Sequence, residues 1–118
     1  MKKYIKASNY RKGGYLYLLK HGIGPGTLPR DVDIVQGWDI DGGNTLVTLD
    51  RFLTSKELRE FDIPSEDQLA YRLADRDYHY ENRPDGFYEI INDETGEVVK
   101  PWRDDSRYII TLDRFLTI

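Results

Sequence analysis

The heptapeptide TLDRFLT occurs twice, at Thr48–Thr54 and at Thr111–Thr117, in a chain of only 118 residues. The similarity extends backwards from both copies, because VQGWDIDGGNTLV precedes the first and VVKPWRDDSRYII precedes the second. With a one-residue shift in this alignment, Trp38 matches Trp102. One β-unit of this size could not bury its apolar face alone, whereas two can share a sheet or pack together. The repeat therefore predicts an internal duplication, over residues 13–54 and 85–117, within a single domain spanning 1–118.

The patterns between these repeats predict an α+β fold. Thr54-x-x-Glu57 and Ser65-x-x-Gln68 match the capping box and predict short helices over 55–61 and 66–78. Short apolar and β-branched runs separated by Gly, Asn and Asp are typical of strands and their turns. The expected strands are 15–19, 32–35, 45–49, a hairpin formed by 87–91 and 97–99, and 107–112. We expect a small mixed or antiparallel sheet built from two related β-units, with one or two short helices in an insertion over 55–80.

The apolar residues of the heptapeptide have the spacing of a helical turn. Leu49, Phe52 and Leu53 follow an i, i+3, i+4 pattern directly after a β-branched strand. This spacing predicts a strand that bends into one helical turn and places all three side chains in the core.

The polar residues of the heptapeptide allow two interpretations. Asp50 and Asp113 can cap the turn, while the arginine of each copy pairs with a carboxylate. Alternatively, Arg51 and Arg114 are both exposed and bind one partner.

The composition excludes several chemistries. The chain has no cysteine, which excludes disulfides, thiolate catalysis and cysteine-ligated zinc. No apolar run approaches the roughly 20 residues of a membrane-spanning helix, and no signal-peptide pattern follows the basic start. We expect a cytoplasmic protein that does not enter a membrane.

No catalytic motif stands out. Phosphate-binding glycine motifs are missing, and the two histidines, His21 and His79, are in no metal-ligating pattern. Paired carboxylates are abundant, but their patterns place them in turns and on solvated faces. The sequence therefore predicts a protein that is not an enzyme, with no catalytic residues, no metal site and no cofactor.

Charge is distributed unevenly along the chain. Residues 1–56 hold nine Lys/Arg and five Asp/Glu, whereas residues 57–106 hold six Lys/Arg and fifteen Asp/Glu. The acidic segment is also rich in tyrosine, and such a surface can bind a basic groove on another protein. This pattern predicts a non-enzymatic interaction protein that inhibits a larger protein partner. The candidate contact residues are Asp75, Asp77, Tyr78, Tyr80, Glu81 and Asp85.

The basic N-terminal stretch supports an alternative function. Interleaved basic and tyrosine side chains can bind phosphates and stack on bases, which is typical of nucleic-acid-binding segments. On this interpretation the contact residues are Lys2, Lys3, Lys6, Arg11 and Lys12. Both stretches are also compatible with ordinary solvated faces.

The opening MKKYIKAS and the segment LPRDVDIV…TLVTLDRFLTSKELREFDIPSE carry a resemblance. Over about half its length the chain resembles small uncharacterised accessory proteins of Firmicutes phages, plasmids and conjugative elements. Some accessory proteins of such elements are single-domain inhibitors of host defence, including anti-CRISPR proteins. The resemblance implies a setting, that of accessory proteins that inhibit host defence, but it does not identify the target and transfers no functional residue. A nucleic-acid-handling enzyme of host defence is one candidate for the larger partner.

Overall fold

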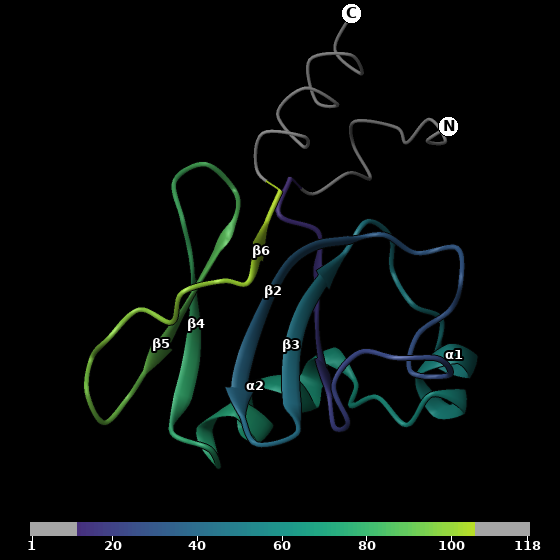
Figure 1. Ribbon diagram of the computed structural model, residues 1–118, viewed down its shortest axis with the longest axis horizontal. Helices are drawn as coiled ribbons and strands as arrows, with labels where there is room; N and C mark the ends of the chain where they lie inside the picture. The colour runs from purple at the N-terminus through teal and green to yellow at the C-terminus, as the bar shows by residue number, and fades with distance from the viewer. Residues whose placement is uncertain (1–11, 106–118) are drawn as a thin grey trace, which may run out of the picture.

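The computed structural model describes residues 12–105, which form an α+β fold (Figure 1). Their hydrogen-bonding pattern defines six strands and two helices. In chain order these are β1 (Tyr15–Leu19), β2 (Ile34–Asp41), β3 (Asn44–Leu49), α1 (Ser55–Glu60), α2 (Glu66–Ala74), β4 (Tyr78–Asn82), β5 (Tyr88–Asn92) and β6 (Arg103–Asp104).

The strands form two antiparallel sheets. The larger has the order β1-β3-β2-β6, and the smaller is the hairpin β4-β5. The predicted turn between β2 and β3 is present at Gly42 and Gly43, where Gly43 has a φ of 99°. Figure 1 shows the β4-β5 hairpin beside the larger sheet, with α2 behind the sheet and α1 at the opposite end.

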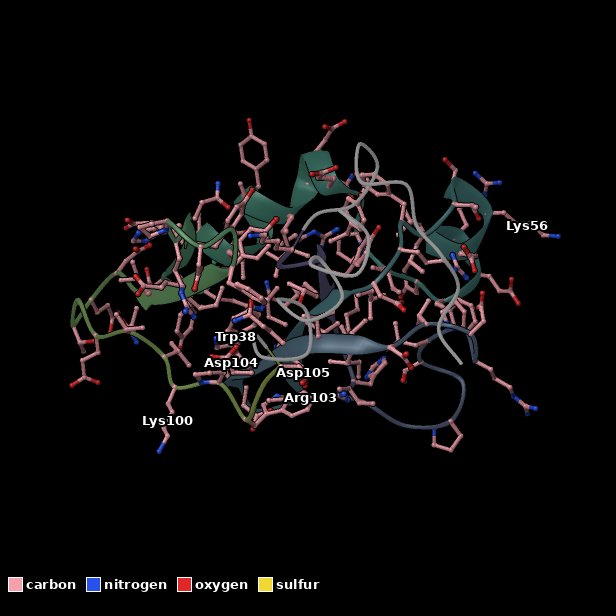
Figure 2. All side chains as sticks on the ribbon, turned by 90° about the horizontal axis from the view of Figure 1, so that it is seen from above. Trp38, Lys56, Lys100, Arg103, Asp104 and Asp105 are labelled. Atoms are coloured by element: carbon pink, nitrogen blue, oxygen red, sulfur yellow. The ribbon has the colours of Figure 1, made fainter. Side chains whose placement is uncertain are left out.

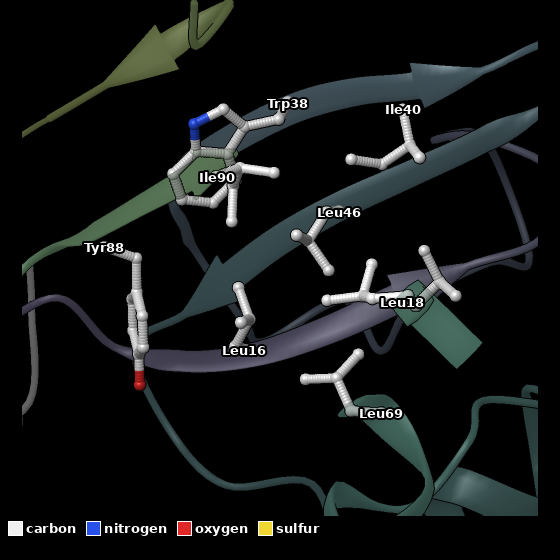
Figure 3. Close-up of a cluster of buried hydrophobic side chains, with 9 residues drawn as sticks. Leu16, Leu18, Trp38, Ile40, Leu46, Leu69, Tyr88 and Ile90 are labelled. Carbon is white, nitrogen blue, oxygen red and sulfur yellow. The ribbon is translucent and has the colours of Figure 1, made fainter. Parts of the chain in front are cut away.

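In the four-stranded sheet, β1, β2 and β3 carry buried side chains, whereas both residues of β6 are exposed. On one face, β1, β2 and β3 pack against α2 and β5 (Figure 3). The residues of this first core are Leu16, Leu18, Trp38, Ile40, Leu46, Leu69, Leu73, Tyr88 and Ile90. On the other face, Val47 and Leu49 pack against Leu53 and Ile63 from the segments around α1. Alternation of side chains along each strand supplies both cores.

The first helix forms as predicted, and the second is shorter. Thr54 and Glu57 form the full capping box at the start of α1. By contrast, the side chain of Ser65 makes no capping hydrogen bond, so the second predicted box is wrong although a helix begins there. The prediction that this helix reaches Tyr78 is also wrong, because α2 ends at Ala74. Asp77 has a φ of 62°, which is incompatible with a right-handed helix.

Two strand predictions also need correction. β2 extends to Asp41 and is thus longer than the predicted strand over 32–35. Residues 97–99 do not form a strand and contribute only an isolated bridge between Ile91 and Val98. Val98 is 56% exposed, whereas Val99 packs against the first core and its amide donates to the Ile90 carbonyl at 2.7 Å.

The first TLDRFLT copy is a bend without a helical turn. Leu49 and Leu53 are buried as predicted, but Phe52 is 56% exposed. Its ring stacks on Tyr15, with ring centroids 3.7 Å apart. Asp50 does not cap a helical turn, and its carboxylate instead accepts a hydrogen bond from the Asp33 backbone amide at 2.9 Å.

Arg51 is held between two carboxylates, as the pairing interpretation predicts. Its guanidinium donates to Asp31 and to Glu57, each at 2.8 Å. Arg51 therefore ties the loop before β2 to the first turn of α1. Asp113 and Arg114, the corresponding residues of the second copy, lie outside the described residues.

The internal duplication stays a prediction, because most of the second copy lies outside residues 12–105, including the strand expected over 107–112. The two matched tryptophans differ in environment, since Trp38 is 1% exposed and Trp102 is 45% exposed. β2 and β6, one from each predicted copy, pair antiparallel through Gln36 with Asp104 and Gly37 with Arg103. Figure 2 shows Trp38 near Arg103 and Asp104.

Within the described residues, no helix is long and apolar enough to cross a membrane.

Candidate protein-binding surface

The β4-β5 hairpin has one face against the protein and one toward solvent. Its inward residues include Tyr78 and Tyr80, which pack against the first core. The Tyr78 hydroxyl donates to the Ile40 carbonyl at 2.9 Å, and Tyr80 packs edge-on against Tyr88 with centroids 5.7 Å apart. Both tyrosines therefore help to fix the hairpin on the sheet. Strand alternation turns both side chains toward the core, where they are half-buried, and their contact with a partner stays a prediction.

The outward residues of the hairpin are His79, Glu81, Glu89 and Ile91, which we call the hairpin face. Glu81 lies directly opposite Glu89 in the strand register. Like charges in directly opposite positions destabilise a strand pair. Among the four residues of this face, His79 is the only basic one. Glu81 and Glu89 therefore repel each other at a pair of positions where opposite charges would be more stable.

His79 partly neutralises this face. Its imidazole contacts Glu81 through Nε2 at 2.9 Å and Asp93 through Nδ1. Hydrogen bonds to Glu81, and then to Asp93, raise the pKa of His79 above its usual value near 6.5. The positive charge on His79 is thus retained to higher pH, and the face becomes more acidic when this proton is lost.

Two further predicted carboxylates lie where α2 meets β4. Asp75 is the residue that ends α2, Asp77 follows in the turn, and both are exposed. The Asp77 carbonyl accepts a hydrogen bond from the Asp93 amide at 2.8 Å, which brings the turn beside the hairpin. Asp75, Asp77 and Glu81 are thus exposed carboxylates on the turn after α2 and on β4, with Arg76 between the two aspartates.

Asp85 has a different role. Its carboxylate pairs with Arg83 at 2.5 Å and accepts the Phe87 amide at 3.1 Å. Both contacts stabilise the turn between β4 and β5. We therefore place Asp85 in the turn and outside the hairpin face.

One exposed aromatic residue was missed by the sequence analysis. Tyr71 on α2 is 75% exposed, and Asp67 and Asp75 lie four residues before and after it. Residues four apart lie on the same helix face, so these three side chains form a stripe opposite the buried Leu69 and Leu73. The signal that could have identified Tyr71 is its position two residues from each leucine, which places it on the opposite side of the helix together with Asp67 and Asp75.

The basic alternative is largely outside the described part of the chain. Lys2, Lys3, Lys6 and Arg11 precede it, and only Lys12 is described. Residues 12–105 hold eleven Lys/Arg against twenty Asp/Glu. Figure 2 shows two of the lysines, Lys56 and Lys100, extending outward at opposite ends of the molecule. The described basic residues are thus outnumbered, and these two are far apart.

Potential catalytic geometry is limited in the described part of the chain. The described residues contain no group of three or more His, Asp or Glu side chains that could hold a metal ion. A hollow of about 370 Å³ lies beside the 24–30 loop and Phe61, and Arg30 is its only titratable lining residue. A second, of about 350 Å³, lies between the two helices and includes Arg59 and Asp62. The second hollow also includes Ser55 and Ser65, and neither lining contains a histidine.

A comparison with family models found no matching family, and searches of curated proteins and of solved structures found no match.

Proposed function

We propose that this chain is a non-enzymatic interaction protein whose hairpin face binds a basic surface on a larger protein. The observation that carries the proposal is the directly opposed pair Glu81 and Glu89 on an exposed strand pair. Natural sequences depart from locally stable choices mainly at functional sites. A partner that supplies Lys or Arg side chains would neutralise both carboxylates and relieve their repulsion.

The neighbouring surface extends this contact. Asp75 and Asp77 add two exposed carboxylates between the hairpin and α2. Tyr71 offers a large exposed ring, and tyrosine supplies contact area with few rotatable bonds. The resemblance to accessory proteins of mobile elements supports inhibition of a nucleic-acid-handling defence enzyme as the consequence of binding. Such an enzyme has a basic groove that carboxylates could occupy in place of phosphates.

Affinity capture from a lysate of a Firmicutes cell tests this proposal. The wild-type chain should retain a specific basic protein, and Glu81→Lys/Glu89→Lys should release it. The matched control is Glu60→Lys/Glu66→Lys, which makes the same charge change at exposed positions on the helices. The control should retain the partner. Equal retention by the two double variants would reject the hairpin face as the binding site.

Nucleic-acid binding is the second candidate function. Residues 1–12 hold five Lys/Arg and no Asp/Glu, which favours contact with phosphates. This function predicts that the chain shifts labelled DNA or RNA at low salt and that binding weakens steeply as salt increases. Lys2→Glu/Lys3→Glu/Lys6→Glu should abolish the shift. Absence of any shift at low salt would eliminate this candidate.

A further inference from the structure

The hairpin holds the start of the described chain. The Gly13 amide donates to the Gly86 carbonyl at 3.1 Å, in the turn between β4 and β5. A Cβ at Gly13 would lie 2.6 Å from that carbonyl oxygen and 2.9 Å from the Phe87 Cα, so this close approach requires glycine. Figure 1 shows the purple start of the described chain near the turn that joins β4 to β5. The described chain therefore begins beside the hairpin.

The charges of the two regions are complementary. Residues 1–11 contain Lys2, Lys3, Lys6 and Arg11 and no acidic residue. The hairpin face carries Glu81 and Glu89, and Glu89 is only three residues beyond the Gly86 anchor. Oppositely charged groups that are joined by a short segment of chain have a high effective concentration with respect to each other, which favours their contact.

The tether is long enough for contact. Eleven residues can span at most about 36 Å, at roughly 3.3 Å per extended residue. Glu81 is five residues from Gly86, a strand distance of roughly 17 Å at ~3.3 Å per residue. Even a partly compact segment can therefore place its lysines on the face.

We propose that residues 1–11 bind the hairpin face of their own chain and compete there with a basic partner. The occupant and the partner share the same chemistry, Lys and Arg side chains set against Glu81 and Glu89. This inference rests on the proposed function for the competition, whereas the intrachain contact can be measured on the isolated protein. It also gives the basic N-terminal stretch a role that requires no nucleic acid.

Paramagnetic relaxation in the full chain tests the contact. The chain has no cysteine, so Ser8→Cys gives a unique attachment site for a spin label. At low salt the label should reduce the amide signals of His79, Glu81 and Ile91. Because the Gly86 anchor already brings the label near residues 86–88, only the face residues beyond them are diagnostic. The signals should recover when an oligolysine peptide is added.

Matched variants separate a charge-directed contact from proximity. Glu81→Gln/Glu89→Gln should restore the face signals, whereas Glu60→Gln/Glu66→Gln should leave the loss unchanged. Unchanged loss in the first variant, or no loss in the wild-type background, would overturn the proposal. A sample that mixes isotope-labelled chain with separately spin-labelled chain tests the remaining alternative. Signal loss there would show that the segment binds a second copy and would likewise overturn the intrachain contact.

The two proposals can fail separately. If the spin label has no effect on the face but Glu81→Lys/Glu89→Lys still releases the captured partner, only the intrachain contact is rejected. If the label reports the contact but neither double variant changes capture, the face serves the chain's own N-terminus and the proposed partner site is wrong.

Discussion

At the scale of single residues, neighbours in one motif have opposite environments. Leu53 is 6% exposed, and its amide donates to the buried Tyr17 hydroxyl at 2.9 Å. The adjacent Phe52 is 56% exposed. The chain bends at Asp50 and Arg51, and after this bend Leu53 faces inward while Phe52 faces outward. The motif thus contributes one aliphatic residue to the core after β3, while its aromatic ring covers Tyr15.

Alanine substitutions should distinguish the two residues. Leu53→Ala should reduce the free energy of unfolding by about 2–5 kcal/mol, because it leaves a cavity in the second core. Phe52→Ala should reduce it by only about 0.5–1.5 kcal/mol, because it removes a largely exposed ring stacked on Tyr15. Urea denaturation of both variants measures the difference. A larger loss for Phe52→Ala would mean that its ring is buried.

The residue pattern of the motif predicted which leucines are buried, but it did not predict the backbone conformation. Leu49 and Leu53 are apolar residues that follow a strongly β-branched run, so their burial was predictable. The exposure of Phe52 was not, because i, i+3, i+4 spacing places it inward only if the backbone is helical. Tertiary contacts decide that conformation here, namely the Tyr17 hydroxyl and the pairing of Arg51 with Asp31 and Glu57. None of these contacts can be read from local spacing.

At the scale of elements, α1 begins at a fully satisfied capping box joined to an ion pair. The Glu57 carboxylate accepts the Thr54 amide and also binds the Arg51 guanidinium. The hydrogen bond from Arg51, reinforced by that from Thr54, lowers the pKa of Glu57 from about 4.5 to about 2. The same guanidinium lowers the pKa of Asp31. The start of this helix was predictable from Thr54 and Glu57, whereas Arg51 and Asp31 meet them only in the folded chain.

The lowered pKa of Glu57 makes stability depend on pH in the acid range. Its folded pKa is below its unfolded pKa, so the contribution is complete above about 4.5 and is lost as pH falls through about 2. Thermal unfolding midpoints measured across that range should therefore fall less steeply for Glu57→Gln than for wild type. The control Glu60→Gln changes an exposed carboxylate of the same helix. If the unfolding midpoint of Glu57→Gln fell with pH as steeply as that of wild type, the ion pair would not be the source of the pH dependence.

The elements of the candidate site were predicted less completely than the fold. Acidic composition identified Asp75, Asp77 and Glu81, and each is exposed. Tyr78 was assigned to the end of a helix although it begins β4, and both Tyr78 and Tyr80 were chosen as partner contacts although they pack against the first core. The opposition of Glu81 and Glu89 depends on the register of β4 with β5. The sequence alone does not show that these two residues are paired, because the register depends on the type of turn that joins the strands.

At the scale of the whole molecule, the two sheets share one core. Ile90 and Tyr88 of the hairpin belong to the same cluster as Leu16, Trp38 and Leu46 of the larger sheet. The buried Gln36 side chain adds a polar link, since it donates to Asp104 at 3.3 Å and accepts the Tyr88 amide at 3.3 Å. An isolated two-stranded hairpin is marginally stable in water. The hairpin face is therefore rigid only because the opposite side of the hairpin is buried against β1, β2, β3 and α2.

This shared core predicts that the sheets unfold together. Ile90→Ala, at a fully buried position, should lower the free energy of unfolding by about 2–5 kcal/mol. Hydrogen exchange should then accelerate equally at β5 amides and at the β3 amides of Leu46 and Val47, because one cooperative unit loses stability. Ile91→Ala is the matched control, since the same atoms are removed from the adjacent, outward position, and its effect should be much smaller. Faster exchange confined to β4 and β5 would show instead that the hairpin opens alone and that the binding face is not held by the larger sheet.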